Sequence, residues 1–247
     1  MLKVARIAEE SRGGLHRKNP GRRNCFREVA SGSVFHLQVH FPRISWGAIV
    51  STARYRDRMD KLRLRTARLL LEPPSATDIE AITAACQDPE IQRWVPIPVP
   101  YALREAEEYV TAYSDSGWAS GRGCTWAIRV DGEFAGAISL DSIGAGQATI
   151  GYWMASQFRG RGLLTEAAEA VVEFGFASMP EGLGLVRIEW HAYAGNLASA
   201  RAARRLGFHF EGTLRLGARG RTGREDDWVA GLLAGEARSP TAWAILR

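Results

Sequence analysis

Cysteine is scarce in this chain, and its spacing does not suit a structural metal site. The 247 residues include three cysteines, Cys25, Cys86 and Cys124. They contain no CxxC pair and have no nearby histidines of the kind that a zinc site needs. An odd number of widely separated cysteines also excludes a disulfide scaffold. We therefore expect no metal site and a reducing, cytoplasmic location.

Long apolar runs are missing as well. No stretch approaches the roughly 20 residues needed to cross a bilayer, and the opening MLKVARIAEESRGG has no apolar segment long enough for a secretory signal. We therefore expect neither membrane insertion nor export. Hydrophobic residues at 46% and charged residues at 24% are typical of a globular protein. The length allows one large domain with an extra segment.

Charge is unevenly divided along the chain. Residues 1–58 hold 12 of the 32 basic residues and 4 of the 27 acidic ones, a net charge of +8, whereas the remainder carries −3. We expect residues 1–58 to be a basic extension that is disordered, or that is not native because translation begins at Met59. A transit peptide and a nucleic-acid-binding arm are the alternatives. Neither has a motif, so a nucleic-acid partner is not expected.

From Met59 onward, strand and helix patterns alternate, which predicts a folded domain over residues 59–236 and a C-terminal tail at 237–247. The dipeptide Asp131-Gly132 between two apolar runs predicts a β-hairpin. The alternation indicates one mixed α/β domain whose sheet carries helices on its faces. The expected strands cover residues 62–71, 125–130, 134–140, 147–155, 186–192, 208–214 and 227–233, and the expected helices cover 77–86, 103–114, 165–178 and 196–206.

One segment joins a strand to a helix through the turn Arg159-Gly160-Arg161-Gly162. Glycines let a backbone approach a ligand closely, and the free N–H groups at the start of a helix attract phosphate. The two arginines would add charges that pair with phosphate oxygens. The turn therefore predicts a phosphate or pyrophosphate site, the alternative being a plain polar turn. It matches neither the dinucleotide nor the P-loop pattern.

A second segment reads GNLASARAARRLGF, and in it Asn196 is a helix N-cap while Gly207 ends the helix. Over residues 62–233 the chain contains, in this order, TARLLLEPP, the turn Asp88-Pro89-Glu90, GYWM, QFRGRGLLTEA, this second segment and EGTLR. Together these motifs resemble the GNAT superfamily of acyl-CoA N-acyltransferases. The resemblance is greatest to the RimJ/RimL branch, the ribosomal-protein N-acetyltransferases and their small-molecule relatives.

The resemblance implies an α/β (α+β) fold: a single GNAT-type domain with a mixed, mostly antiparallel central sheet, a splayed strand pair and helices on both faces. It implies acetyl-CoA as the co-substrate, with backbone groups of Met154 and Ala155 on its pantetheine arm and Asn196 beside its thioester. It also implies Ser199 as the proton donor to the departing thiolate. The residues implied to hold the pyrophosphate are Arg159, Gly160, Arg161, Gly162, Leu163 and Leu164.

The general base is less well defined. Alternation along the strand at 186–192 puts Glu189 on one face with Arg187 and His191, where it could hold a water that takes the amine proton. A surface glutamate is the alternative. Some RimL-like proteins have an acidic residue nineteen positions after the serine, where this chain has Ala218. His191 and His209 are further candidates.

The expected function is direct acetyl transfer to a primary amine, either a protein N-terminal α-amine or a small-molecule amine. A catalytically silent acyl-CoA-binding sensor is the alternative. Substrate choice is expected to depend on residues 94–101, 118–124 and the basic segment 215–227. This last segment reads as a solvated loop, the alternative being a segment that favours an acidic peptide or a substrate carboxylate. The expected partners are the amine substrate, for example a ribosomal protein, with no membrane and with a monomer or homodimer as the assembly.

Overall fold

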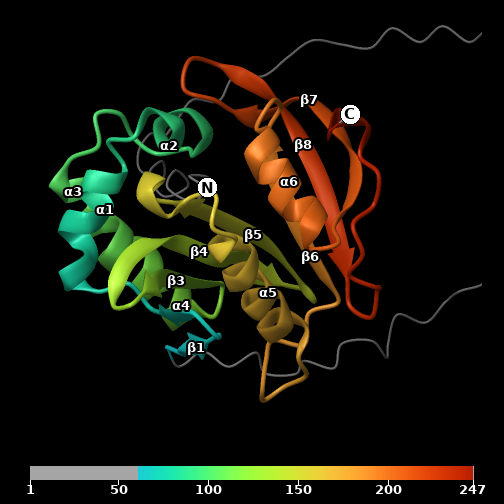
Figure 1. The fold of residues 1–247 in the computed structure, drawn as a ribbon, viewed down its shortest axis with the longest axis horizontal. Helices are drawn as coiled ribbons and strands as arrows, with labels where there is room; N and C mark the ends of the chain where they lie inside the picture. Colours follow the sequence, from blue (N-terminus) through green and yellow to red (C-terminus); the bar gives the residue numbers. More distant parts are fainter. Residues whose placement is uncertain (1–60, 247) are drawn as a thin grey trace, which may run out of the picture. The chain divides into compact units, whose positions relative to one another are not determined.

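The computed structural model describes residues 61–246, so the predictions for residues 1–58 lie outside the described part of the chain. The described residues form one eight-stranded sheet in the order β1-β2-β3-β4-β5-β6-β8-β7 (Figure 1). The strands are β1 (Leu64–Arg65), β2 (Leu69–Glu72), β3 (Gly123–Val130), β4 (Glu133–Gly144), β5 (Gln147–Met154), β6 (Arg187–Tyr193), β7 (His209–Arg219) and β8 (Arg224–Leu233).

The expected splayed strand pair is β5 and β6. Every other neighbouring pair of this sheet is antiparallel, whereas β5 and β6 run parallel, because helix α5 crosses over between them. Their ladder starts at Gln147 and Arg187 and ends at Ile150 and Trp190. Beyond this point β5 pairs with β4 and β6 pairs with β8, so the two halves of the sheet diverge, as Figure 1 shows.

Helices cover both faces of the sheet, as expected. Trp126, Ile138 and Trp190 belong to a large buried cluster that includes the apolar sides of α5 (Leu163–Phe176) and α6 (Leu197–Arg205). A smaller cluster on the opposite face joins Phe134 and Trp153 to the other helices. Those helices are α1 (Ile79–Ala85), α2 (Pro89–Trp94) and α3 (Leu103–Glu108). Strand alternation explains the division, since neighbouring residues point to opposite faces.

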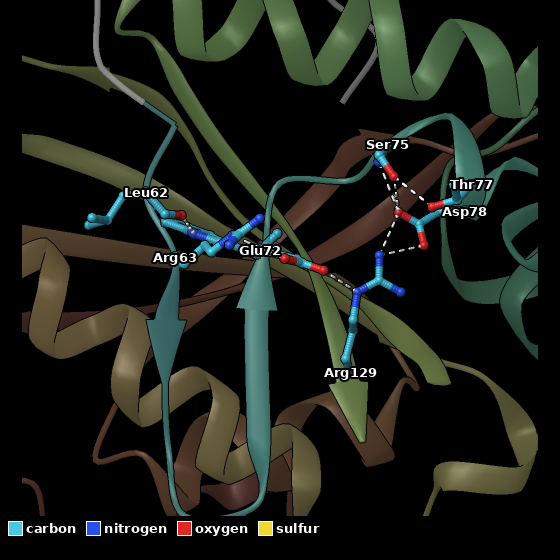
Figure 2. Close-up of polar contacts among 8 residues, drawn as sticks. Leu62, Arg63, Glu72, Ser75, Thr77, Asp78 and Arg129 are labelled. Carbon is cyan, nitrogen blue, oxygen red and sulfur yellow. Dashed lines mark hydrogen bonds and ion pairs between the residues drawn. The ribbon is translucent and has the colours of Figure 1, made fainter. Parts of the chain in front are cut away.

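A partly buried ion-pair network joins the first helical segment to the sheet (Figure 2). Arg129 on β3 contacts Glu72 on β2 through Nε at 2.5 Å and Asp78 through Nη2 at 2.8 Å. Asp78 is buried, and its carboxylate also accepts the backbone N–H of Ser75 at 2.8 Å, which caps the short 3₁₀ turn before α1. The guanidinium therefore sets the distance between α1 and the sheet.

Several predicted elements differ in the structure. The strand expected at 62–71 is the hairpin β1–β2, because the side chain of Thr66 accepts the N–H of Leu69 and turns the chain. The helix expected at 103–114 is α3 followed by a π-helical segment (Tyr109–Asp115) and α4 (Ser116–Ser120). α2 occupies the Asp88-Pro89-Glu90 turn, where the Asp88 side chain caps the helix.

The basic segment at 215–227, read as a loop, is largely the hairpin of β7 and β8. Its backbone hydrogen bonds, with a register shift between Leu214 and Ala218, form a ladder that its charged side chains do not signal. The end of the described chain packs on the domain: the Trp243 indole is buried and donates to the carbonyl of Phe208 at 3.1 Å. No helix between residues 61 and 246 has the length and apolarity to cross a bilayer.

Candidate active site

The turn between β5 and α5 contains two glycines in a left-handed backbone conformation. Gly160 and Gly162 have φ of 74° and 75°, in the left-handed region that glycine adopts without steric cost. Gly162 directly precedes α5, and its carbonyl accepts the N–H of Glu166. The N–H groups of Leu163, Leu164 and Thr165 therefore stand before the first helical hydrogen bond, as they do at any α-helix N-terminus.

A hollow of about 540 Å³ lies at this turn. It includes Gly160 and Gly162, and two arginines reach it from distant segments, Arg68 from the β1–β2 connection and Arg205 from the last turn of α6. Neither arginine is predicted from the sequence, because neither stands near the glycine turn along the chain. The lining residues are Arg68, Gly160, Gly162, Thr165, Glu166, Glu169 and Arg205.

Arg68 ties the turn to α5. Its Nε lies 2.6 Å from Oε2 of Glu166, and its Nη1 donates to the carbonyl of Arg161 at 3.2 Å. Thr66 donates to the same carboxylate at 2.5 Å. Burial alone raises the pKa of Glu166, but the hydrogen bonds from Thr66 and Arg68 outweigh it and hold this pKa below its usual value. The carboxylate is therefore charged, and Arg68 neutralises it.

The side chains of Arg159 and Arg161, the two arginines of the turn, do not line this hollow. Arg159 donates through Nε to the carbonyl of Met154 at 2.9 Å and pairs with Asp88 at 2.7 Å. Arg161 places its guanidinium 5.7 Å from the centre of the Phe158 ring. The positive charges of the hollow come from Arg68 and Arg205 instead.

The backbone at the end of β5 presents one of the two expected residues to the diverging strands. Ala155 donates its N–H to the carbonyl of Ala135 at 2.9 Å, so this amide is used by the sheet. In an antiparallel ladder, adjacent residues of one strand point their N–H and C=O groups to opposite sides. Met154 therefore faces the side on which β6 diverges, and the expectation for Ala155 is corrected to Met154 alone.

Ser199 lies where β5 and β6 part. Its Oγ accepts the indole N–H of Trp190 at 3.0 Å and donates to the hydroxyl of Tyr152 at 3.3 Å. Asn196 caps α6 as predicted, accepting the N–H of Ser199 at 3.1 Å. Burial raises the pKa of Tyr152 to about 12, so its hydroxyl stays protonated. Sequence patterns alone did not single out Tyr152 or Trp190 for this site.

The opposite face of β6 carries charged side chains. Glu189 accepts Nε of Arg187 at 3.0 Å, and Arg187 also binds Glu211 on β7. Nδ1 of His191 lies 2.8 Å from Asp227 on β8, and Nε2 lies 3.6 Å from Glu189. The hydrogen bond with Asp227 raises the pKa of His191 against the opposing effect of burial.

A family model described as an acetyltransferase (GNAT) domain matches residues 68–209. The chain belongs to the GNAT family. The turn at Gly160 and Gly162, the diverging strands and the helix that Asn196 caps all lie within the matched residues. The predicted family and fold are confirmed, and the GNAT match together with its relatives supports an acyl-CoA acetyltransferase.

Named relatives of this GNAT protein agree with that assignment. YoaA of Bacillus subtilis, an uncharacterized N-acetyltransferase, is 30% identical over 156 residues, which are 62% of this chain and 85% of YoaA. RimJ of Mycobacterium smegmatis, solved in complex with CoA-disulfide, is 25% identical with a TM-score of 0.61, covering 67% of this chain and 82% of RimJ. RimL, a ribosomal alpha-N-protein acetyltransferase solved with coenzyme A, shares the fold at 20% identity and a TM-score of 0.63, covering 70% of this chain and 98% of RimL.

The residues present fit coenzyme A. The hollow combines left-handed glycines, helix-terminal N–H groups and two arginines, which together suit a diphosphate. Among the described residues no group of three or more His, Cys, Asp or Glu side chains could hold a metal ion.

Proposed function

We propose that this GNAT protein transfers acetyl from acetyl-CoA directly to a primary amine, either a protein N-terminal α-amine or a small-molecule amine. The observation that carries the proposal is the position of Ser199 at the point where β5 and β6 part, with the arginine-lined hollow at the end of β5. The name of RimL, a ribosomal alpha-N-protein acetyltransferase, supports a protein N-terminus as the acceptor.

The cofactor end of the site is built from backbone groups and two side chains. The N–H groups from Gly160 to Leu164, with Arg68 and Arg205, hold the diphosphate. The acyl end of the pantetheine arm lies against the backbone of Met154 on the side where β6 diverges, and Asn196 contacts the arm beside the thioester. Arg159 does not bind phosphate in this arrangement. It donates to the carbonyl of Met154 and forms an ion pair with the carboxylate of Asp88.

The transfer needs three things from the protein. The amine must lose a proton, the carbonyl oxygen must be stabilised as it gains charge, and the thiolate must be protonated as it leaves. The N–H of Met154 serves the oxyanion, and the hydroxyl of Ser199 protonates the sulfur. Holding amine and thioester together between the strands supplies much of the remaining rate.

The two cysteines between residues 61 and 246 favour direct transfer over a covalent acyl-enzyme. Cys86 and Cys124 are both buried. Burial raises the pKa of the Cys86 thiol to about 12 and also raises that of Cys124. A neutral, buried thiol is a poor nucleophile, so the amine attacks the thioester itself.

The test is an acetylation screen with the full chain. Acetyl-CoA is offered with N-terminal peptides, with small amines, and with the same peptides blocked at the α-amine, and products are identified by mass spectrometry while thiol release is followed. We expect one amine class to gain 42 Da at its nitrogen, a mass that follows from acetyl replacing hydrogen. Tight acetyl-CoA binding without turnover on any acceptor would overturn the proposal in favour of a silent sensor.

A further inference from the structure

His191 occupies a distinctive position in the diverging sheet. It follows Trp190, the last residue of β6 that is paired with β5. Successive strand residues point to opposite faces. Trp190 reaches Ser199 on the α6 side, whereas His191 faces the other side together with Glu189. The proposed proton donor and the imidazole thus lie on opposite sides of the sheet at the same point of divergence.

Asp227 fixes the orientation of this imidazole. Its carboxylate is 7% exposed and lies 2.8 Å from Nδ1 of His191. A carboxylate at Nδ1 keeps the N–H on that nitrogen, which leaves the lone pair of neutral histidine on Nε2. The His191 side chain is 36% exposed. Nε2 lies 3.6 Å from Oε2 of Glu189, which is beyond hydrogen-bond distance, so an amine can approach Nε2 beside that carboxylate. The pair has the geometry of a histidine held by an acidic partner.

We propose that Nε2 of His191 takes the proton from the acceptor amine, with Asp227 as the positioning residue that orients the ring. The inference deepens the proposed function and rests on it. The amine nitrogen supplies the electron pair of the new C–N bond, and its proton passes to Nε2. The C–S bond breaks with its electron pair on sulfur, which takes a proton from Ser199. The imidazolium returns its proton to solvent, and Ser199 regains one from solvent.

Glu189, the acidic residue expected from the sequence, is less suitable for this role. It lies opposite Thr149 in the closed part of the β5–β6 ladder. Its carboxylate already accepts Nε of Arg187 at 3.0 Å. His191 is two residues further along the same face, beyond the last paired position, where an acceptor can reach the thioester. Glu189 then acts as a neighbouring charge.

The charges around His191 suit a group that accepts a proton. Asp227 on β8 and Glu189 on β6 face the imidazole, while the nearby cations are paired elsewhere, Arg187 with Glu211 and Arg93 of α2 with Glu225. The hydrogen bond with Asp227 raises the pKa of His191 against the opposing effect of burial. The two carboxylates therefore stabilise the imidazolium that forms when Nε2 takes a proton.

The experiment measures kcat/KM between pH 6 and 10 for the amine found in the acetylation screen, with the full chain. The constant is calculated on the concentration of unprotonated amine, so that the titration of the substrate itself does not contribute to the profile. His191→Gln should lose about 100-fold or more and lose the acidic limb of the profile, while acetyl-CoA binding by calorimetry stays within about twofold of wild type. Asp227→Asn should shift the limb to lower pH, because the carboxylate that raises the pKa of His191 is gone. His209→Gln, a histidine on β7 two strands from β6, should keep the wild-type profile.

Failure of the proposed function and failure of the role of His191 give different results. A wild-type chain that acetylates no amine defeats the proposed function. An active wild type whose His191→Gln variant keeps the same rate and the same limb overturns the role of His191 and leaves the proposed function intact. If His191→Gln fails to fold, Asp227→Asn decides: a uniform loss at every pH with an unmoved limb overturns the inference, because a merely structural carboxylate gives that result.

Discussion

The indole N–H of Trp190 donates a hydrogen bond to Oγ of Ser199 over 3.0 Å. Because this donor occupies one lone pair of the hydroxyl, the serine proton points elsewhere, and its partner is the Tyr152 hydroxyl at 3.3 Å. That second bond is long for two hydroxyls, so the proton can turn toward a developing thiolate at small cost. A strand residue at the point of divergence therefore orients the proton donor on the neighbouring helix.

Replacing Ser199 with Ala should lower kcat about 100-fold with KM for acetyl-CoA nearly unchanged, because the hydroxyl acts on the leaving thiolate rather than on the bound thioester. Steady-state kinetics measures both quantities. Tyr152→Phe is the matched control, since it removes the partner hydroxyl and keeps the ring, and it should retain most of the turnover. Undiminished kcat in Ser199→Ala would remove Ser199 from the acid role.

Gly162→Ala should weaken acetyl-CoA binding by about tenfold, because the new methyl group stands in the hollow beside Arg68, 3.8 Å from its guanidinium. The control is Gly132→Ala in the β3–β4 hairpin, where φ is 86° and nothing lies within 4 Å of the added carbon. Both variants place a side chain in the left-handed region and should lose about 1–2 kcal/mol in the free energy of unfolding. Equal acetyl-CoA affinities of the two variants would contradict the diphosphate assignment.

Local signals in the sequence predicted the elements that local chemistry determines. Asp131-Gly132 gave the β3–β4 hairpin and Asn196 gave the cap of α6, because a turn or a cap depends on a few adjacent residues. The turn at Gly160 and Gly162 is predictable for the same reason, since only glycine adopts a left-handed φ at low cost.

Long-range partners could not be read from the sequence. Arg68 and Arg205 meet at one hollow although 136 other residues separate them in the chain. The side chain of Arg159 is oriented by its ion pair with Asp88, the residue that caps α2. The pairing of His191 with Asp227 needs β8 to lie between β6 and β7, an order that strand patterns do not encode. Each of these contacts is decided by the sheet topology.

Arg68→Ala should weaken acetyl-CoA binding about tenfold, because the charge that neutralises Glu166 is lost and a bare carboxylate then faces the diphosphate. The loss should be largest at low ionic strength, where charges are least screened. Arg65→Ala, an exposed arginine on β1 three residues earlier, is the control and should bind normally. Acetyl-pantetheine, which lacks the diphosphate, should react equally well with both variants, and an equal defect with both donors would refute the assignment.

Asp78→Ala should lower the free energy of unfolding by about 3 kcal/mol, because it leaves the guanidinium of Arg129 short of a buried partner and frees the N–H of Ser75. Asp78→Asn keeps an acceptor for Ser75 without the charge, so its loss should be smaller. Urea denaturation of both variants measures the difference. A loss below about 1 kcal/mol in Asp78→Ala would show that Glu72 alone satisfies Arg129.

The pairing of His191 with Asp227 should make stability depend on pH in a defined direction. The pKa of His191 is raised above 6.5 in the folded protein by its hydrogen bond to Asp227, so between 6.5 and this raised value the folded state binds more protons than the unfolded chain. The stabilisation is fully present below the unfolded pKa and is lost as the pH rises through the folded pKa.

Wild type should therefore exceed His191→Gln in free energy of unfolding by more at about pH 6 than at about pH 9. Urea titrations at both pH values measure this difference, which should largely disappear when both proteins also carry Asp227→Asn. A difference that is equal at the two pH values would mean that the imidazole is not held by a charged carboxylate, because only a charged partner stabilises the protonated ring.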